Sequence, residues 1–411
     1  MGNLKLAFFL AYKAILKGSR WTLALIILVM SLSFANLILT PSIMSGVTQA
    51  INKEQINTLF GHIIIDPPEG SLFLNDTGQI LQKISGEAAI AGVAPHINST
   101  AMFEYIPGNT SLKEEKTGNW NVIGIDPEKE TRVTTIAQSM ISGSYLEPGD
   151  TDKIVLGVEI AGGEQAESKD FLTLGGVKIG DSITLVFPTG TERQYKVKGI
   201  FKARGGNANN LAFVNRPELA SALNLPSDQD ATSQILIRLH NSSQEQQVIS
   251  KLGTLLTGPQ VRSWSDYGGG IGNIVSSFGV VASLIGGIGL LVAGVVMFIV
   301  IYINVANRRR QIGILRAIGI NRKVVMGSYL LQALLYGISG IIIGGLIFGY
   351  IIKPIFDSHP IDLPIGLVSL AIEPGNIRNA VIGLIFASVL AGIFPVLNIT
   401  RHSIIRAIWG N

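Results

Sequence analysis

Four long runs of apolar residues divide this chain, and each is long enough to cross a membrane. They cover residues 21–43, 274–303, 326–352 and 380–397. Because about 20 residues of α-helix span the hydrocarbon core of a bilayer, each run predicts one transmembrane helix. The second run would be about 45 Å long as a helix, so we expect it to project from the membrane on the side of the large polar segment before it.

The segments between these runs complete the expected organisation. Residues 1–20 and 398–411 are the two ends, 304–325 and 353–379 are short loops, and 44–273 is long enough for a folded domain. We therefore predict a membrane protein with four transmembrane α-helices and a large α+β extracytoplasmic domain inserted between helices 1 and 2.

Both strand and helix patterns occur within residues 44–273, which is why a mixed domain is expected. Strands are predicted at residues 63–65, 183–187, 194–201, 211–214 and 234–238. Helices are predicted at residues 78–85, 131–139, 217–223 and 244–252. Pro188 and Gly190 separate two of the strands and predict a hairpin.

The first 20 residues combine a broad apolar face, which includes Phe8, Ala11 and Ile15, with Lys5 and Lys13. This pattern predicts an interfacial helix that lies under the membrane and turns into the first span. A straight extension of that span into the cytosol is an equal alternative. Cleavage as a signal peptide is disfavoured, because the apolar run is too long and continues past the poor cleavage site at residues 33–35.

Charge decides the expected orientation. Residues 1–20, 304–325 and 398–411 contain twelve Lys or Arg and no acid, whereas all 28 acids lie in the other two polar segments. By the positive-inside rule, both termini and the basic loop are cytoplasmic in a multi-pass protein of the cell (inner) membrane. The net charge of +4 and the pI near 9.1 therefore reflect topology and attraction to membrane lipids, and we expect no nucleic-acid partner.

Composition excludes several chemistries. The chain of 411 residues is 47% hydrophobic and 15% charged, as a membrane protein would be, and it has no cysteine for a disulfide, a thiolate metal ligand or a thiol nucleophile. Nucleotide-binding, zinc-protease and serine-hydrolase motifs are missing from the sequence. Its five histidines are spread over both sides of the membrane in this topology, so we expect no catalytic residue and no metal site.

Small residues recur every four positions in three of the predicted spans. They are Gly279, Ser283 and Gly287 in the second, Gly340 and Gly344 in the third, and Gly383 and Ala387 in the fourth. Such faces let helices approach closely, either within one subunit or between subunits. The spans contain no Asp, Glu, Lys, Arg or His, which argues against an ion-coupled transporter.

The basic loop at residues 304–325 holds the most distinctive pattern. Arg308, Arg309 and Arg310 lead into an apolar stretch, and helical spacing would place Ile312, Leu315 and either Ile318 or Gly319 on one side. We expect a short amphipathic helix at the cytoplasmic membrane face, with an apolar side that needs a partner. The alternative is a positive loop that only determines topology.

The stretch at residues 307–319 strongly resembles the cytoplasmic signature of the FtsX/MacB-like ABC transporter permeases. Three further places agree with that family, the last of them in two parts, and the first is closest to the lipoprotein-releasing (Lol-type) permease subunits. They are residues 43–47 with 61–64, residues 153–157, 180–185 and 197–201, the pair Phe394 and Pro395, and Arg401 with residues 405–408. Ser403 departs from the pattern, because these permeases often have proline there.

The resemblance implies a permease subunit that pairs with a second permease copy or paralogue and with a dimer of separate ABC ATPase subunits. The chain itself would then be no enzyme and would bind no cofactor, since ATP and Mg would bind to the ATPase. Carried over from the family, the coupling helix that sits on the ATPase consists of Gln311, Ile312, Gly313, Leu315, Arg316, Ala317 and Gly319, preceded by the three arginines.

The family also implies what the assembly does. Its members extrude lipoproteins or other amphiphiles from the outer face of the membrane, with the MacB-like extracytoplasmic domain moved by the ATPase. The alternative is a non-transporting subunit that transmits mechanical motion to an envelope enzyme. Cell-division members resemble this chain less, because their extracytoplasmic domain is usually shorter.

Overall fold

The computed structural model describes residues 2–16, 20–107, 115–164, 166, 172–204, 207–226, 230–267 and 269–401. It divides into two compact units. The helical unit comprises Met1–Gln49, Asn273–Asp362 and Leu367–Asn411, and the sheet domain comprises Ala50–Gly272 and Leu363–Gly366.

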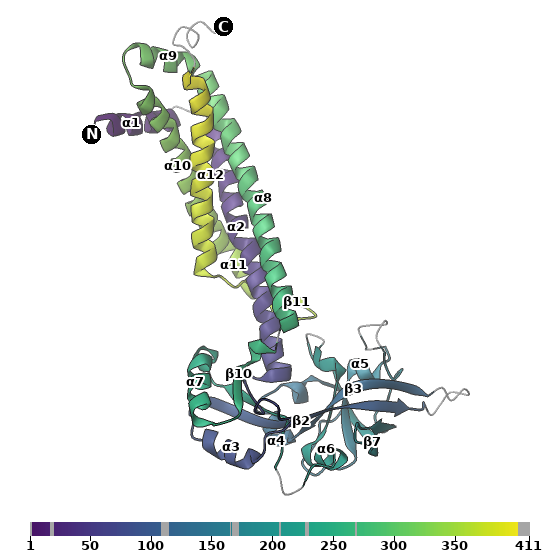
Figure 1. The fold of residues 1–411 in the computed structure, drawn as a ribbon. Helices are drawn as coiled ribbons and strands as arrows, with labels where there is room; N and C mark the ends of the chain where they lie inside the picture. The colour runs from purple at the N-terminus through teal and green to yellow at the C-terminus, as the bar shows by residue number, and fades with distance from the viewer. Residues whose placement is uncertain are drawn as a thin grey trace. The chain divides into compact units, whose positions relative to one another are not determined.

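Four helices in the described chain are long and apolar enough to cross a membrane, as predicted (Figure 1). They are α2 (Arg20–Gln55) with its π-helical continuation η1 (Ile56–Phe60), α8 (Gly269–Asn307), α10 (Arg322–Ile347) with η6 (Phe348–Ile352) and α11 (Lys353–Ser358), and α12 (Pro374–Arg401). All four helices extend beyond the apolar runs predicted from the sequence, at one end or at both. Polar residues such as Lys53 do not break a helix, so hydropathy marks where a helix is apolar rather than where it ends.

The helical unit has one apolar core shared by its long helices. Met30 and Phe34 of α2 pack with Met297 of α8 and Tyr336 of α10 in this core. A Cβ on Gly289 in α8 would lie 2.9 Å from the side-chain nitrogen of Asn36 in α2, so these two helices are also in close contact.

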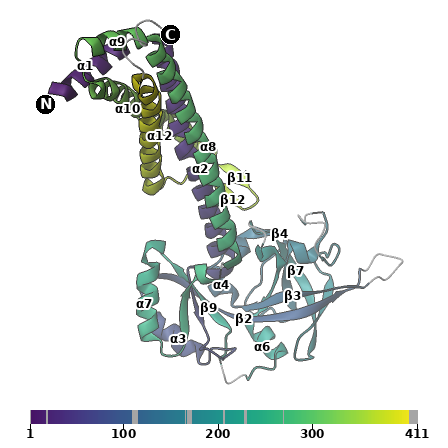
Figure 2. The same ribbon diagram turned by 45° about the horizontal axis from the view of Figure 1, so that its top comes forward.

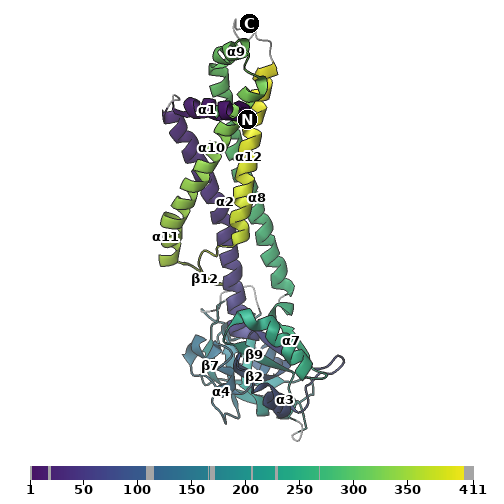
Figure 3. The same ribbon diagram turned by 90° about the vertical axis from the view of Figure 1, so that its left-hand side faces the viewer.

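Helix α1 (Gly2–Leu16) crosses the direction of α2 instead of continuing it (Figures 1 and 3). It packs on α10, where a Cβ on Gly327 would be 3.6 Å from the Cβ of Ala7. The straight extension of the first span is therefore wrong. The expected turn near Gly18 lies outside the described residues.

The sheet domain is built on ten strands and several short helices. The strands are β1 (Ile63–Asp66), β2 (Ile90–Tyr105), β3 (Lys116–Ile125), β4 (Met140–Gly143), β5 (Lys153–Gly157), β6 (Ser182–Val186), β7 (Glu192–Phe201), β8 (Leu211–Asn215), β9 (Gln234–Leu239) and β10 (Gln260–Ser263). The helices are α3 (Thr77–Ile84), α4 (Pro127–Glu130), η2 (Ile136–Ser139), α5 (Val158–Ala161), η3 (Asn207–Asn210), α6 (Arg216–Ala222), η4 (Ser242–Gln244), α7 (Glu245–Leu255) and η5 (Trp264–Asp266).

Six of the strands close into a ring. The pairing runs β2, β3, β8, β5, β7 and β6, and β6 returns to pair with β2 through Met102 opposite Val186. Phe103, Tyr195 and Val197 are fully or almost fully buried in the core that this ring encloses. Closure leaves these strands with few free edges, which stabilises the sheet without disulfides.

A second layer extends from the same sheet. Here β10, β1, β9 and the first half of β2 pair in that order, and α3 and α7 lie beside them (Figure 2). Ile63, Ile65 and Ile237 of the strands pack with Ile84 of α3 and Leu252 of α7. The long strand β2 thus belongs to both layers.

Most predicted elements of this domain are confirmed. The five predicted strands correspond to β1, β6, β7, β8 and β9, and three of the predicted helices to α3, α6 and α7. The hairpin is also present, with β6 and β7 antiparallel and the amide of Phe187 bonded to the carbonyl of Thr191 at 3.0 Å. The long strands β2 and β3 were not predicted.

The predicted helix at residues 131–139 is wrong. Glu130 is buried, with Oε2 2.5 Å from Nε2 of His96, and Oγ1 of Thr134 donates to Oε1 of Glu130 at 2.7 Å. These contacts hold the chain after α4 as a turn against β2, and only the 3-10 helix η2 follows. Threonine side chains that form local hydrogen bonds compete with helix formation, which explains why the predicted helix does not form.

The segment between α11 and α12 also has structure of its own. It contains a two-stranded hairpin of β11 (Ile361–Leu363) and β12 (Gly366–Val368). The remaining helix, α9 (Arg309–Ala317), lies in the basic loop.

Candidate functional site

Helix α9 forms within the basic loop and ends at a glycine. Gly319 has φ +100°, a conformation that residues with a side chain rarely adopt. The amide of Ile320 donates to the carbonyl of Leu315 at 3.1 Å and closes the helix end. Asn321 then caps α10 by accepting a hydrogen bond from the amide of Lys323 at 2.9 Å. A short, hydrogen-bonded link therefore joins α9 to α10.

Helix α9 has two apolar faces instead of the single one expected. Ile312 is 4% exposed and packs in the core of the helical unit, and Leu315 lines a cavity with it. Ile314 and Ile318 are 45% and 75% exposed. The expectation that Ile318 shares a side with Ile312 is wrong, because four-residue spacing aligns it with Ile314.

The other residues expected in the coupling helix are divided between these faces. Arg310, Gln311, Ala317 and Gly319 are exposed, Gly313 is buried, and Arg316 is half-buried. The side chain of Arg309 lies outside the described residues.

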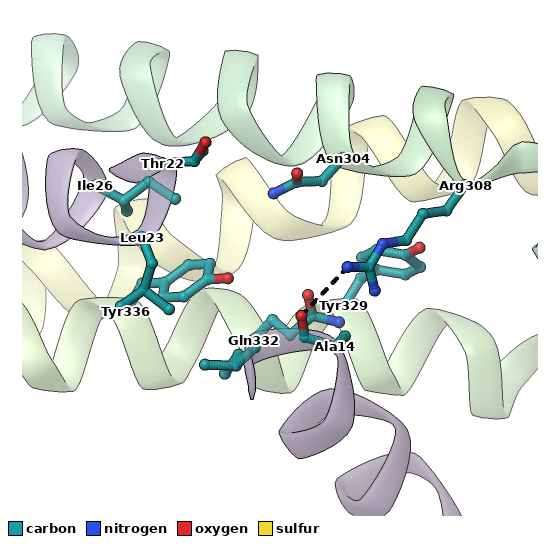
Figure 4. A pocket seen from close by; sticks show the side chains of 10 residues that line it. Ala14, Thr22, Leu23, Ile26, Asn304, Arg308, Tyr329, Gln332 and Tyr336 are labelled. Carbon is teal, nitrogen blue, oxygen red and sulfur yellow. Dashed lines mark hydrogen bonds between the residues drawn. The ribbon is translucent and has the colours of Figure 1, made fainter. Parts of the chain in front are cut away.

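Arg308 lies at the junction of α8 and α9 and points into the helical unit (Figure 4). Its Nη2 donates to the main-chain carbonyl oxygen of Ala14 in α1 at 3.3 Å. Tyr329 and Gln332 of α10 lie beside it and line the same pocket. Sequence reasoning grouped Arg308 with a docking surface, whereas the structure shows it linking three helices.

Gly340 and Gly344 bring α10 into very close contact with α2. A Cβ on Gly340 would lie 2.5 Å from the Cβ of Met30, and one on Gly344 would lie 2.5 Å from the carbonyl oxygen of Ser31. Any side chain at these positions would force the helices apart. A Cβ on Gly383, in contrast, would lie 3.5 Å from the side chain of Leu290 in α8, which is an ordinary van der Waals distance.

The predicted small residues of α8, in contrast, are not in close contact with another described helix. A Cβ on Gly279 or Gly287 would meet no described atom within 4 Å, and Ser283 is exposed. Gly287 and Ala387 of α12 line an apolar groove of about 420 Å³. Within the described chain this face of α8 has no protein partner, and its packing between subunits stays a prediction.

Two glycines in the stretches that resemble lipoprotein-releasing permeases have packing roles. A Cβ on Gly46 in α2 would overlap the carbonyl oxygen of Ser369. Gly61 follows η1 with φ +64°, and a Cβ there would lie 2.7 Å from the carbonyl oxygen of Ile237. Both positions need glycine for local geometry, independently of any ligand.

His62 is buried in the sheet domain beside β9. Its Nδ1 accepts a hydrogen bond from the amide of Leu239 at 3.2 Å. Burial, together with the positive charge of Arg238, lowers the pKa of His62 to about 4. The ring is therefore neutral near pH 7, and its role is structural.

Sequence reasoning missed a groove of about 770 Å³ in the sheet domain. Phe60 and Tyr267 stack in its wall with ring centroids 5.7 Å apart. Gln55 is 4% exposed, and its Oε1 has no hydrogen-bond partner within the described chain. The lining residues come from distant segments, so no local sequence signal could have found them.

No group of three or more His, Asp or Glu side chains within the described residues is arranged to hold a metal ion. The buried pair of His96 and Glu130 has its contacts inside the fold, where β2 passes from one layer to the other. Its arrangement supports the strand crossing and indicates no catalytic site.

Comparison with known families gives two matches. The MacB-like periplasmic core domain family matches residues 23–255, and the FtsX-like permease C-terminal family matches residues 283–404. The first match alone covers more than half of the chain.

Individual relatives agree with these matches. The lipoprotein-releasing system transmembrane protein LolC of Xylella fastidiosa is 28% identical over 345 residues, which cover 78% of this chain and 75% of LolC. The macrolide export ATP-binding/permease protein MacB of Campylobacter jejuni is 29% identical over 121 residues, which cover 29% of this chain and 18% of MacB.

Two solved structures are similar to part of the chain. The extracellular domain of the noncanonic ABC-type transporter YknZ from Gram-positive bacteria is 12% identical with a TM-score of 0.35, covering 49% of this chain and 98% of that domain. The periplasmic region of MacB from Actinobacillus actinomycetemcomitans is 13% identical with a TM-score of 0.36, covering 55% of this chain and 98% of that region.

Proposed function

This chain belongs to the MacB-like periplasmic core domain family and has an FtsX-like permease C-terminal region, and from that premise we propose that it couples ATP hydrolysis on a separate ATPase to movement of its sheet domain. ATP and Mg bind to the partner ATPase in this proposal. A second permease copy or paralogue packs on the small-residue face of α8.

The observation that carries the proposal is the division of α9 into two apolar faces. Ile312 packs the inner face into the core of the helical unit, so a displacement of α9 would disturb that core. Ile314 and Ile318 leave the outer face exposed, and an exposed apolar surface on a short helix suits a protein partner. A loop that only determined topology would need no such surface.

Motion of α9 would pass to the other helices through contacts already described. The short link through Gly319 and Asn321 ties α9 to α10. Gly340 and Gly344 then hold α10 against α2, which is one helix from Arg20 to Gln55. A displacement caused by ATPase closure would thus reach the chain segment that begins the sheet domain.

The distribution of charge supports the orientation used here. In the ends of the chain and the loop that contains α9, every charged side chain is basic, and the sheet domain contains most of the acids. Both termini and α9 are therefore cytoplasmic in this proposal, and the sheet domain lies on the outer side of the cell (inner) membrane.

Lipoproteins or other amphiphiles are the substrate class that we propose. The similarity to LolC, whose name describes lipoprotein release, extends over most of both chains and supports this choice. Depletion of the protein should therefore slow the release of lipoproteins from the membrane. Unchanged release on depletion would refute lipoproteins as the substrate. Other amphiphiles would remain, together with the alternative in which the same motion activates an envelope enzyme.

Affinity purification tests the coupling proposal. We expect an ABC ATPase to co-purify with the wild-type chain from its native membrane and to be lost with Ile318→Asp, which places a charge in the outer face of α9. Leu72→Asp is the matched control, because Leu72 is 82% exposed in the sheet domain. Equal ATPase recovery with Ile318→Asp and the wild type would refute docking on this face.

A further inference from the structure

We propose that the cavity between α1, α9 and α10 binds the phosphate of an anionic membrane phospholipid. This cavity, called here the Arg308 cavity, has a volume of about 310 Å³. Its location at the membrane interface rests on the proposed topology. The bound lipid would be a structural ligand, distinct from any transported substrate.

The Arg308 cavity has the chemistry of an anion site. Two cations line it, Lys13 from α1 and Arg308 from the start of α9. Tyr329 of α10 adds its hydroxyl to the same wall. Ser328 and Gln332 also line it, and their side chains donate to the carbonyls of Val325 and Ser328. Residues 1–20 and 304–336, which supply the whole lining, contain no Asp or Glu.

The charge of Arg308 lacks compensation within the described chain. Its side chain is half-buried, and its hydrogen bond goes to the neutral carbonyl of Ala14 (Figure 4). Moving a cation into an apolar setting is costly unless an opposite charge accompanies it. A phosphate oxygen would provide that charge, and a guanidinium binds phosphate well through paired N–H groups.

The surroundings favour a lipid as the source of the phosphate. Phe8, Phe9 and Tyr12 of α1 are more than half exposed, and Phe9 lies 6.0 Å from the ammonium nitrogen of Lys13. Exposed aromatic residues next to cations are typical of a helix at the boundary of headgroups and acyl chains. Two cations also favour a headgroup with net negative charge over a zwitterionic one.

Lipid retention tests the proposal directly. The full chain would be placed in nanodiscs of equal phosphatidylglycerol and phosphatidylcholine, and the lipids that stay bound after detergent extraction would be counted by native mass spectrometry. We expect the wild type to retain one phosphatidylglycerol in preference to phosphatidylcholine. Lys13→Gln with Arg308→Gln should reduce this retention about tenfold, because charge-assisted hydrogen bonds are lost.

Matched variants separate the site from general charge effects. Lys323→Gln removes an exposed cation outside the cavity and should behave as the wild type. Arg308→Lys keeps the charge and should keep most of the retention. Lys13→Gln alone changes only an exposed side chain, so it should fold normally and still weaken phosphatidylglycerol binding.

Several results would overturn the proposal. They are equal retention of both lipids, unchanged retention in the double variant, and an equal loss with Lys323→Gln. Displacement of phosphatidylglycerol by millimolar inorganic phosphate would identify a site for free anions instead of lipid. None of these results depends on ATPase recovery, so the lipid site and the coupling proposal can fail separately.

Discussion

A Cβ on Gly344 in α10 would stand 2.5 Å from the carbonyl oxygen of Ser31 in α2. The two helices therefore meet backbone to backbone at this point. Lipid gives no hydrophobic drive for helices to associate, so contacts of this kind contribute much of the stability of a membrane bundle.

Gly344→Ala should destabilise the helical unit by about 1–3 kcal/mol, because the new methyl group must displace main-chain atoms. Gly345→Ala is the control on the same helix, since its Cβ would lie 3.8 Å from the Phe34 ring. Thermal unfolding in detergent measures both changes. Similar melting temperatures for the two variants would contradict the close contact.

Lys198 and Asp150 form a shielded ion pair in the sheet domain, with Nζ and Oδ2 2.7 Å apart and both side chains 16% exposed. Burial raises the pKa of Asp150, but the hydrogen bonds from Lys198 and the Glu147 amide and the charges of Lys198 and Lys153 together outweigh it, so the pKa stays below its usual value. The pair therefore stabilises the fold above the ordinary pKa of an aspartate, and this stability is lost as pH falls through the lowered value. Asp150→Asn should cost about 1–2 kcal/mol near pH 7.

Asp152 provides the comparison for that pair. It is 64% exposed and pairs with Lys153, so Asp152→Asn should leave the unfolding free energy near pH 7 unchanged. Chemical denaturation of the two variants measures the difference. A loss with Asp152→Asn as large as that with Asp150→Asn would show that shielding is irrelevant here.

His62 should make the sheet domain sensitive to mild acid. Its pKa is lowered to about 4, so the unfolded chain binds a proton first as pH falls below the ordinary histidine value of about 6.5. The stability due to neutral His62 is thus complete above that value and declines toward pH 4. The melting temperature should fall by several degrees between pH 7.5 and pH 5.

His62→Asn should reduce that decline, because an asparagine oxygen can accept the bond from the Leu239 amide without taking up a proton. His240 is exposed, and His240→Asn should keep the wild-type pH dependence. An unchanged decline in His62→Asn would assign the effect to other groups.

Gly287 tests the assembly through α8. A Cβ at Gly287 would meet no described atom within 4 Å, so we expect Gly287→Leu to fold normally while its side chain fills the unpartnered face. Pairing with a second permease copy or paralogue should weaken about tenfold, as measured by recovery of a differently tagged partner. Gly349→Leu, at another glycine with no described neighbour, should pair as the wild type does. Normal pairing of Gly287→Leu would exclude this face.

The elements that the sequence predicted well are those with a strong local signal. Apolar runs long enough to cross a bilayer identified all four long helices, and the small-residue spacing identified Gly340 and Gly344. The hairpin of β6 and β7 followed from two alternating runs around a Pro and Gly turn. Each of these signals lies within a few turns of chain.

The features that were missed depend on contacts between distant residues. Pairing of Met102 with Val186 closes the strand ring, yet neither strand contains a signal for the other. The contact between His96 and Glu130 holds the chain as a turn where a helix was predicted. The exposure of Ile318 likewise depends on which face of α9 packs into the helical unit, and the sequence alone does not determine that face.

The contact of Asn36 with Gly289 has a consequence for biogenesis. These residues belong to helices that are separated in the sequence by the entire sheet domain, so the ribosome must make that domain before the second helix of the pair exists. During this interval α2 lacks its neighbour α8, whereas every strand of the ring is synthesised before α8 begins. Synthesis itself therefore imposes an order in which the domain precedes closure of the helices.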